Sequence, residues 1–577
     1  MNLSTESSSR SFFFWGCLLL VLLGVFVFYP VCFATFNWDD HVIINPENFQ
    51  PAGSLATLWL NPRTAIAGDY WPLDYTSHWM EFQLWGMNAR GYHLVNLALH
   101  LFNACLLWYL LQRIAVRGAL LVAILFTLHP MQVSSVAWIV ERKDLLNTLF
   151  YFLAFAAWMR FDEKPGWTRY LITAIFFVAS LLCKSMSITW PVAALLYIWW
   201  RTGRVNRRRI YAAAFLLALA FPLVFIRPLL GWVTPPLGIA PLSWMEKIIL
   251  VGRNWCFYAS KLVWPLEHVA VYPKWDINPH HAILFCFPAT MVLVLAALWI
   301  LRNRIGRGPF AATAFYTLTL SPILGLISWS LLKTTYVQDH YQYIASIGPF
   351  LLGAYAFEMY APRWFRFVKK PEIVAYAPLS IFLLIPLSVL ANYHAALYHD
   401  RETLFRENYR RYPTATSVAL QYASGLLNNR KTMSAYPIID HAIALDPQLA
   451  ANWQVKGNIL YNLNRLSEAR TVYERALVLD PQDADSIFGY TTVLLKLTPP
   501  EAERAITLLE QALQRMPANN FLHENMAKAL LLNGQADKAL VHFETALRAD
   551  PFNADLLNQY HQAQTTCSAP QKTLRVP

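Results

Sequence analysis

The chain has 577 residues, of which 56% are hydrophobic and only 14% are charged, and its formal net charge at pH 7 is +12. A soluble globular protein is about 25% charged, so this composition excludes an ordinary soluble domain and also a disordered chain. All of the excess charge lies in the first 399 residues, which hold 29 basic and 17 acidic residues, whereas the remainder is neutral. A basic excess confined to the apolar part argues against nucleic-acid binding and for a membrane protein whose cations flank its spans.

Apolar stretches recur along the first 399 residues, and a bilayer core of about 30 Å needs about 20 such residues in a helix. We expect an all-α fold with about eleven spans, the first of them an uncleaved anchor because its apolar run is too long for a signal peptide. The predicted spans are 11–34, 92–112, 118–138, 145–160, 169–183, 186–200, 210–230, 282–301, 310–332, 342–361 and 374–393.

The short loops predict the orientation, because cytoplasmic loops carry the excess of Lys and Arg. Six basic clusters fall on one side if these spans alternate, and they contain 18 of the 29 basic residues. The clusters are Arg10; Arg113 and Arg117; Arg160, Lys164 and Arg169; Arg201, Arg204 and Arg207 to Arg209; Arg302, Arg304 and Arg307; and Arg363, Arg366, Lys369 and Lys370. The segment 246–264 carries three basic residues, so we place it at the outer interface. The N-terminus is then cytoplasmic, and the loop 35–91 and the C-terminal region are extracytoplasmic.

The C-terminal region repeats itself. Phrases such as ALDP end at Pro447, Pro481, Pro517 and Pro551, at intervals of 34, 36 and 34 residues. Two sets of alanines keep the same register: Ala435, Ala469, Ala505 and Ala539, then Ala442, Ala476, Ala512 and Ala546. Small residues at both positions let two antiparallel helices approach closely, and this pattern is typical of tetratricopeptide repeats. The chain after Pro551 is expected to begin a capping helix.

These patterns predict four parts. Residues 1–395 form the membrane domain, 396–415 a linker, 416–565 about four repeats with the start of the cap, and 566–577 a tail. The alanines are expected to be packing residues. A functional surface of the repeats would be their concave face, which typically binds a peptide or protein.

Polar patches at the outer ends of the spans are candidate sites, because ionisable groups are costly there. Asp39 and Asp40 follow the first span as an adjacent pair, and either could accept a proton from a hydroxyl. A solvated turn is the alternative interpretation. His93, Asn96 and His100 share one helical face, so they line an interior or hydrogen-bond between spans.

The other two patches are mixed in charge. Glu141, Arg142, Lys143 and Asp144 precede the span 145–160, where Asp144 could simply cap a helix. Basic residues are disfavoured on that face, so an anionic ligand would explain Arg142 and Lys143. Lys184 and the run YVQDHYQY, with Asp339, His340 and Tyr343, form the last patch.

Signatures of soluble enzymes are absent from the sequence: it has no GxxxxGK[ST], GxSxG, HExxH or CxxC. Two adjacent carboxylates are too few ligands to argue for a metal, so we expect no metal site and leave a divalent-cation requirement open.

The order of WDDHVIIN, PLDYTSHWMEFQLWG, GYHLVNLALH, HPMQVSSVAWIVERKDLL, CKSMSITWP and QDHYQYIAS, followed by tetratricopeptide repeats, resembles the transmembrane and tetratricopeptide-repeat O-mannosyltransferase-like proteins. That family is grouped with the protein O-mannosyltransferases among the GT-C membrane glycosyltransferases. The resemblance covers nearly the whole chain and rests on motif order, since each motif alone is weak.

The resemblance implies transfer of a sugar, most often mannose, from a polyprenyl- or dolichyl-phosphate donor to a Ser or Thr hydroxyl, with inversion. It implies Asp39 or Asp40 as the base and Arg142, Lys184 and His340 as contacts for the donor phosphate, while His93, Glu141 and Tyr343 would line the substrate cavity. No other cofactor is implied. The repeats would recruit the acceptor protein.

Two positions depart from the family pattern, since Ser185 and His340 stand where the family usually has Glu and Arg. A neutral imidazole holds a phosphate less well than a guanidinium, so these departures bear on the donor. The short repeat array indicates a bacterial inner-membrane protein facing the periplasm; in a eukaryote the membrane would be that of the endoplasmic reticulum.

Two alternative functions stay open. A non-catalytic scaffold would use the membrane part only to anchor the repeats, but it would have no use for opposite charges around an outer cavity. A lipid-linked sugar transporter would place ionisable residues deep within several spans, where they are scarce in this sequence. The sugar, the acceptor and the oligomeric state are not encoded in any motif.

Overall fold

The computed structural model describes residues 3–49, 54–61, 70–229, 242–327, 332, 334–364, 376, 378–517, 519–549 and 553–568. Every regular element within these ranges is a helix, which confirms the expected all-α fold. The chain divides into two compact units, one formed by Met1–Ile44 with Leu55–Asp400 and the other by Asn45–Ser54 with Arg401–Pro577.

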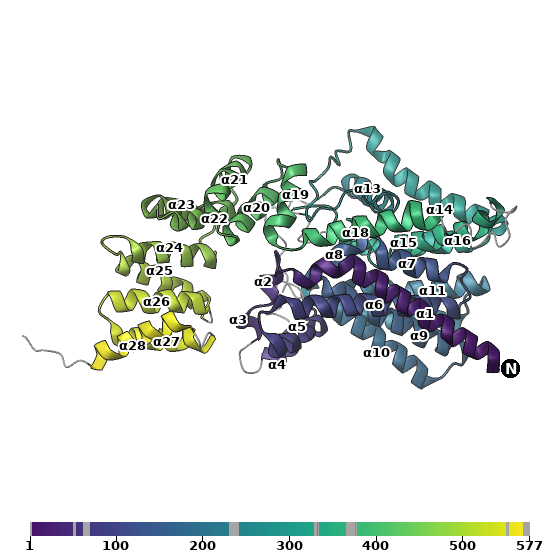
Figure 1. The fold of residues 1–577 in the computed structure, drawn as a ribbon, viewed down its shortest axis with the longest axis horizontal. Coiled ribbons are helices and arrows are strands. Elements are labelled where there is room, and N and C mark those ends of the chain that lie inside the picture. Colours follow the sequence, from purple (N-terminus) through teal and green to yellow (C-terminus); the bar gives the residue numbers. More distant parts are fainter. Residues whose placement is uncertain are drawn as a thin grey trace, which may run out of the picture. The chain divides into compact units, whose positions relative to one another are not determined.

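The first unit contains the helices that are long and apolar enough to cross a membrane, and Figure 1 shows the arrangement of its helices. Its N-terminal half comprises α1 (Leu3–Phe28), η1 (Tyr29–Phe33), α2 (Asp40–Ile43), α4 (Ser54–Leu60), α5 (Pro72–Trp85), α6 (Ala89–Arg113), α7 (Ala119–Leu128), η4 (Pro130–Gln132), α8 (Val133–Ala137), η5 (Ile139–Glu141) and α9 (Arg142–Glu163). Its C-terminal half comprises α10 (Trp167–Cys183), η6 (Ser185–Thr189), α11 (Trp190–Thr202), α12 (Arg207–Leu229), α13 (Trp244–Val263), η7 (Ala282–Phe285), α14 (Cys286–Ile305), α15 (Gly308–Leu320), η8 (Ser321–Ile323), η10 (Asp339–Gln342), α16 (Ile347–Trp364), the π-helix η11 (Ser380–Leu384) and α18 (Ile385–Leu397).

Each of the eleven predicted spans contains a helix, and α1 packs against α6, α7 and α18 while α9 packs against α6 and α10. Five helices among the described residues are long and apolar enough to cross a membrane, or six if one bent pair is counted. The five are Ser11–Phe33, Ala89–Arg113, Arg207–Phe225, Ala282–Ile305 and Ser380–Leu397. The number of crossings and their orientation stay predictions, as does the interfacial position of α13.

The predicted span 118–138 is not one continuous helix. α7 ends at Leu128, and the chain bends by 60° before the residues Pro130–Ala137. Pro130 lacks an N–H and cannot continue the hydrogen-bond ladder of α7, while the side chain of His129 accepts a hydrogen bond from the amide of Met131 at 3.3 Å. The bend directs the short helices α8 and η5 toward the polar site described below.

Two other predicted spans differ clearly in their limits. α11 begins at Trp190 after the 3-10 turn η6, and α15 ends at Leu320, well before residue 332. Residues 230, 328–331 and 374–375, which close or begin predicted spans, lie outside the described residues, as do Arg366, Lys369 and Lys370 and most of the tail 566–577.

The second unit contains the repeats (Figure 1). Its helices are α3 (Pro46–Phe49), α19 (Arg401–Arg411), α20 (Thr416–Asn428), α21 (Thr432–Leu445), α22 (Ala450–Asn462), α23 (Leu466–Leu479), α24 (Ala484–Lys496), α25 (Ala502–Arg515), α26 (Asn520–Leu532), α27 (Ala536–Ala549) and α28 (Ala554–Ser568). Four helix pairs run from α20 to α27, α28 follows Pro551, and α19 lies within the segment expected to be a linker and packs on α20.

The core of the repeats is built on the two sets of alanines. All eight are buried, with exposed fractions between 0% and 4%. Gly457 serves the same purpose, because a Cβ at this position would lie 2.6 Å from the ring of Tyr473. The predicted repeat register is therefore confirmed, and these residues are packing residues.

Candidate functional site

The two adjacent acids that follow α1 differ in burial: one carboxylate is buried and the other is half-buried. Asp40 is fully buried, and its oxygens accept hydrogen bonds from the amide of Asn37 at 2.7 Å and from the amide of Val140 at 3.1 Å. Asp39 is half-buried at the N-terminus of α2. Asp40 thus ties the first loop to η5, and Asp39 is the more accessible acid.

Burial also controls the protonation of Asp40. Loss of hydration raises its pKa to about 8; the two amide donors act against this shift, and the charges of Asp39 and Glu141 add to it. Asp40 is therefore mostly protonated at pH 7. A neutral buried acid is suited to holding a loop in place.

The segment before the pair is fixed by the end of α18. The side-chain amide of Asn37 donates to the carbonyl of Tyr398 at 2.6 Å, and the amide of Thr35 donates to the carbonyl of His399 at 2.9 Å. Trp38 has a φ of +41° and its ring stacks on that of Trp138, with 4.9 Å between centroids. The acidic pair is therefore held at a defined position beside the residues that follow α8.

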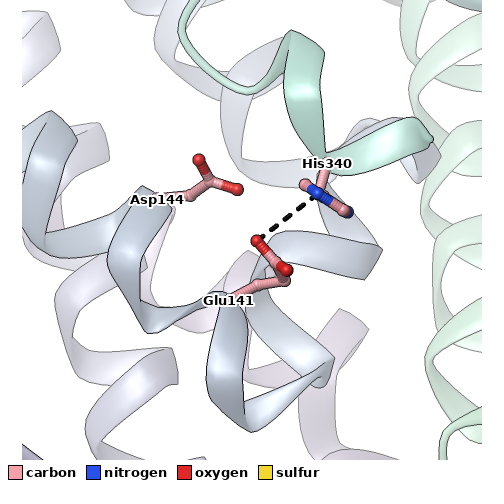
Figure 2. A group of neighbouring side chains, drawn as sticks. All are labelled: Glu141, Asp144 and His340. Carbon is pink, nitrogen blue, oxygen red and sulfur yellow. Dashed lines mark ion pairs between the residues drawn. The ribbon is translucent and has the colours of Figure 1, made fainter. Parts of the chain in front are cut away.

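Opposite charges meet next to the acidic pair in what we call the charged cluster: Glu141, Lys143, Asp144, Lys184 and His340. Nζ of Lys143 lies 2.8 Å from Oε1 of Glu141. Nζ of Lys184 lies 2.6 Å from Oδ1 of Asp144 and 3.6 Å from Oε2 of Glu141, and Nε2 of His340 lies 3.5 Å from the same Oε2. Figure 2 shows Glu141 and Asp144 approaching His340 of η10 from η5 and the start of α9. Four segments thus converge: η5, the start of α9, the junction of α10 with η6, and η10.

The protonation of the cluster follows from burial and from the lysines. Burial acts to raise the pKa of Glu141, but the positive charges of His340 when it is protonated, of Lys143 and of Lys184 outweigh it and lower the pKa below its ordinary value. Burial lowers the pKa of His340 to about 3, so its imidazole is neutral at pH 7. The two ammonium groups therefore supply the positive charge that keeps Glu141 ionised.

A metal ion fits this cluster poorly. Glu141, Asp144 and His340 offer ligand atoms that lie within 4.8 Å of one another. The ammonium of Lys184, however, is in contact with both carboxylates and already compensates their charge. A divalent cation would have to displace that ammonium against the further charge of Lys143. The charge of the two carboxylates is therefore better compensated by the two lysines than by a metal ion.

Arg142 has different partners from those we expected. It is fully buried, its guanidinium forms an ion pair with Glu81 of α5, Nε donates to Oδ1 of Asn96 at 2.7 Å, and Nη2 donates to the carbonyl of Tyr92 at 2.7 Å. These bonds join α5, α6 and α9. The predicted contact of Arg142 with a donor phosphate stays a prediction. Lys143, which pairs with Glu141 as Lys184 does, is only partly buried.

The helix α6 joins the site through hydrogen bonds. Nδ1 of His100 lies 2.7 Å from the hydroxyl of Tyr343. His93 is buried in the same helix but takes no part in the ion pairs of the charged cluster, so its predicted place in a substrate cavity stays a prediction. Of the two interpretations left open for this face, hydrogen bonding between helices is the one that Asn96 and His100 follow.

A small cavity of about 20 Å³ lies beside the cluster, with Asp144, Asn147, Tyr341 and Tyr343 in its wall. This volume holds about one water molecule. It is too small for a sugar in the conformation of this structure.

Two further polar groups were missed in the sequence. Asp74, His78 and Glu81 lie at spacings of four and three residues on one face of α5, all buried, and burial raises the pKa of Asp74 to about 7 although Lys143 and Arg142 lower it. That spacing was visible in PLDYTSHWMEF. The second group depends on long-range contacts: Asp339 accepts a hydrogen bond from Tyr272 at 3.0 Å and lies 3.0 Å from Nδ1 of His268.

Comparisons with known proteins find one repeat family and a group of curated relatives. The family description "TPR repeat" matches residues 457–489, from α22 to α24. Protein O-mannosyl-transferase Tmtc1 of Drosophila melanogaster is 32% identical over 166 residues, covering 27% of this chain and 19% of that protein. Protein O-mannosyl-transferase TMTC4 of Homo sapiens is 29% identical over 213 residues, covering 30% and 28% respectively. The matches thus span less than a third of these relatives' length.

Among solved structures, a thermophilic TPR protein of Thermus thermophilus is 22% identical, with a TM-score of 0.26 and coverage of 33% of this chain and 98% of that chain. The resemblance indicated by the motif order is confirmed: the chain is similar to the protein O-mannosyl-transferases and carries tetratricopeptide repeats.

Proposed function

We propose that the protein is a multi-pass membrane glycosyltransferase that moves a sugar, most often mannose, from a polyprenyl- or dolichyl-phosphate donor to a Ser or Thr hydroxyl of a protein. The names of the relatives support the reaction class. The observation that carries the proposal is structural: the bond between Asp40 and the amide of Val140 places the acidic pair one residue from Glu141 and its two lysines.

Asp39 is the base in this proposal. It is the more accessible acid of the pair, whereas both oxygens of Asp40 are engaged in positioning the loop. The carboxylate of Asp39 takes the proton of the acceptor hydroxyl as its oxygen attacks the anomeric carbon. The bond from that carbon to the phosphate oxygen breaks, the configuration inverts, and the lipid phosphate leaves with the electron pair.

Lys143 and Lys184 hold the leaving phosphate. A lipid phosphate is a weak base, so it needs nearby positive charge more than a proton. Both ammonium groups lie against Glu141, and the neutral imidazole of His340 can donate one hydrogen bond from the same side. The repeats recruit the acceptor protein, and the site and the repeats face the extracytoplasmic side, the periplasm if the protein is bacterial.

The test is sugar transfer in membranes that express the protein, with labelled polyprenyl-phosphate mannose and co-expressed extracytoplasmic proteins. We expect transfer by the wild type and a loss of roughly 100-fold or more in Asp39→Asn, because general base catalysis contributes about 10²–10⁴. Asp276→Asn is the matched control, an exposed acid of the same first unit. Its transfer rate should equal that of the wild type.

A wild type that transfers no sugar from mannosyl or other lipid-phosphate donors, while the repeats still bind a partner protein, would overturn the proposal. The membrane-anchored scaffold would then be the better account of the chain. Equal losses in Asp39→Asn and Asp276→Asn would remove Asp39 from the mechanism.

A further inference from the structure

A second and much larger cavity lies in the first unit, apart from the charged cluster. Its volume is about 620 Å³, within the range of small-molecule sites, and its wall is formed by α6, α9, α11, α15 and α16 with the loops that precede α7 and α15. Aliphatic and aromatic side chains such as Leu107, Phe155 and Leu351 make up most of this wall.

Two arginines belong to the wall of the same cavity. Arg117 lies in the loop between α6 and α7, and Arg307 lies between α14 and α15. Nη1 of Arg307 donates to the carbonyl of Trp199 at 3.3 Å, and Arg117 is exposed. Neither guanidinium has an ion-pair partner within 4.0 Å among the described residues.

The carboxylates of the neighbouring helix ends are engaged elsewhere. Glu163 pairs with Arg113 at 2.9 Å, Asp162 pairs with Arg209 at 2.5 Å, and Glu358 accepts a hydrogen bond from the hydroxyl of Tyr376. Among the described residues, the two arginines therefore have no compensating carboxylate at this mainly apolar cavity.

Arginines at the ends of apolar helices commonly extend to the membrane surface without binding any ligand. That explanation accounts for the charges but not for the large, mainly apolar cavity that the two arginines line. Basic pockets between transmembrane helices are sites for anionic lipid headgroups. A lipid with a hydrocarbon chain and one phosphate matches both the apolar wall and the two arginines.

We infer that this cavity binds an anionic membrane lipid, with one hydrocarbon chain against the apolar wall and the phosphate between Arg117 and Arg307. The inference is independent of the proposed transferase activity. Tyr151 borders both this cavity and the small cavity beside Asp144, so the proposed lipid is separated by that residue from the phosphate held at Lys184.

The experiment measures which lipids stay bound when the full-length protein is purified in mixed phosphatidylglycerol and phosphatidylcholine micelles and examined by native mass spectrometry. We expect one phosphatidylglycerol to be retained in preference to phosphatidylcholine. The double variant Arg117→Ala/Arg307→Ala should lose roughly 30-fold of this preference, at about 1 kcal/mol for each arginine near a phosphate.

Two further variants separate the two features of the site. Arg204→Ala/Arg304→Ala removes two exposed arginines that do not line the cavity and should retain the wild-type preference. Leu196→Trp fills the cavity from α11 and should reduce retention of both lipids, while both arginines stay in place.

Three results would overturn the inference. The first is equal retention of the two lipids by the wild type, and the second is an unchanged preference in Arg117→Ala/Arg307→Ala. The third is displacement of the bound lipid by stoichiometric mannosyl-phosphoryl polyprenol, which would assign the cavity to the sugar donor. Inorganic phosphate added alone should not compete, because it lacks the hydrocarbon chain.

Discussion

Charged side chains are mostly exposed in the repeats, whereas several of them are buried in the first unit. In the repeat helices α20 to α27 the Lys, Arg, Asp and Glu side chains are exposed or partly exposed, as in the pair of Arg504 with Glu474, and the core is made of alanines and other apolar residues. Glu402 of α19, in the same unit, is the exception, since it is buried and pairs with Arg406 and Lys431. In the first unit, Glu141, Lys184 and Arg142 are buried, and their ion pairs join helices that are distant in sequence. A repeat is therefore stabilised by its packing, whereas the polar site of the first unit depends on complete pairing of its charges.

The largest effect is expected where a buried charge loses its partner. Lys184→Met leaves Glu141 and Asp144 without their shared ammonium, and breaking a buried pair costs about 3–5 kcal/mol. The unfolding temperature of the purified protein in detergent should fall accordingly. Lys538→Met, at an exposed position of α27, is the control and should change stability by less than about 0.5 kcal/mol.

A double variant tests whether the loss of stability comes from the unpaired carboxylates. Lys184→Met combined with Asp144→Asn should recover part of the lost stability, because one of the two unpaired carboxylates is then neutral. If Lys184→Met alone is as stable as Lys538→Met, Lys184 does not form a buried ion pair with Glu141 and Asp144.

In the repeats the most destabilising substitutions are expected to be those that enlarge a buried alanine. Ala469 is fully buried, and Ala469→Leu inserts three carbon atoms between packed helices, which costs about 1–3 kcal/mol. Hydrogen exchange in the full-length protein should rise in α22 to α25 and stay unchanged in the first unit. Thr471→Leu, exposed on the same helix, should leave exchange unchanged; a similar rise in both variants would contradict the assigned register.

The pH dependence of stability should reveal the buried acids of the first unit. Asp40 has a folded pKa of about 8, above the ordinary value of 3.8, so between these values the folded state binds more protons than the unfolded state. Stability then falls as the pH rises toward 8. His340, with a pKa of about 3, is neutral in the folded state, and an unfolded histidine is largely neutral above pH 6.5, so it contributes little there.

The measurement is the unfolding temperature between pH 6.5 and 8, compared for the wild type and Asp40→Asn. One carboxyl contributes at most about 1.4 kcal/mol per pH unit in this window, and the variant should show a flatter curve. Asp74, with a pKa of about 7, contributes a slope of the same sign that remains in the variant. Parallel curves would show that Asp40 titrates normally.

The smallest effect is expected on the surface of the repeats. Arg504 lies 2.9 Å from Glu474 and 3.5 Å from Glu501, but its side chain is 48% exposed. Arg504→Ala should cost no more than about 1 kcal/mol, and the difference should shrink in high salt. A loss as large as that of Lys184→Met would contradict the contrast between the two units.

Much of the fold was predictable because it depends on local patterns. The alanine register predicted the repeat helices, and apolar runs predicted the helices of the first unit. The break at His129 was not predicted, although Pro130 lies within the predicted span 118–138. A proline in an apolar run kinks some helices and ends others. Which of these two occurs depends on what packs after the proline.

The residues of the candidate site could be predicted from the sequence, but most of the pairs that they form could not. Motif order singled out Asp40, Glu141, Lys184 and His340, which the structure brings together, with Asp40 joined to Val140. The ion pair of Arg142 with Glu81 of α5 was not predicted, because the two residues are distant in the sequence and only the fold brings them together. Adjacent residues at the start of a helix point in different directions, so Arg142 and Lys143 have different surroundings.

The central claim is that Asp39 reacts while Asp40 holds the loop, and the most direct test measures both transfer rate and unfolding temperature in Asp39→Asn and Asp40→Asn. The account predicts that Asp39→Asn loses transfer with an unchanged unfolding temperature, and that Asp40→Asn retains measurable transfer with an altered pH dependence of stability. The reverse result, full transfer in Asp39→Asn and its loss in Asp40→Asn at normal stability, would contradict the account.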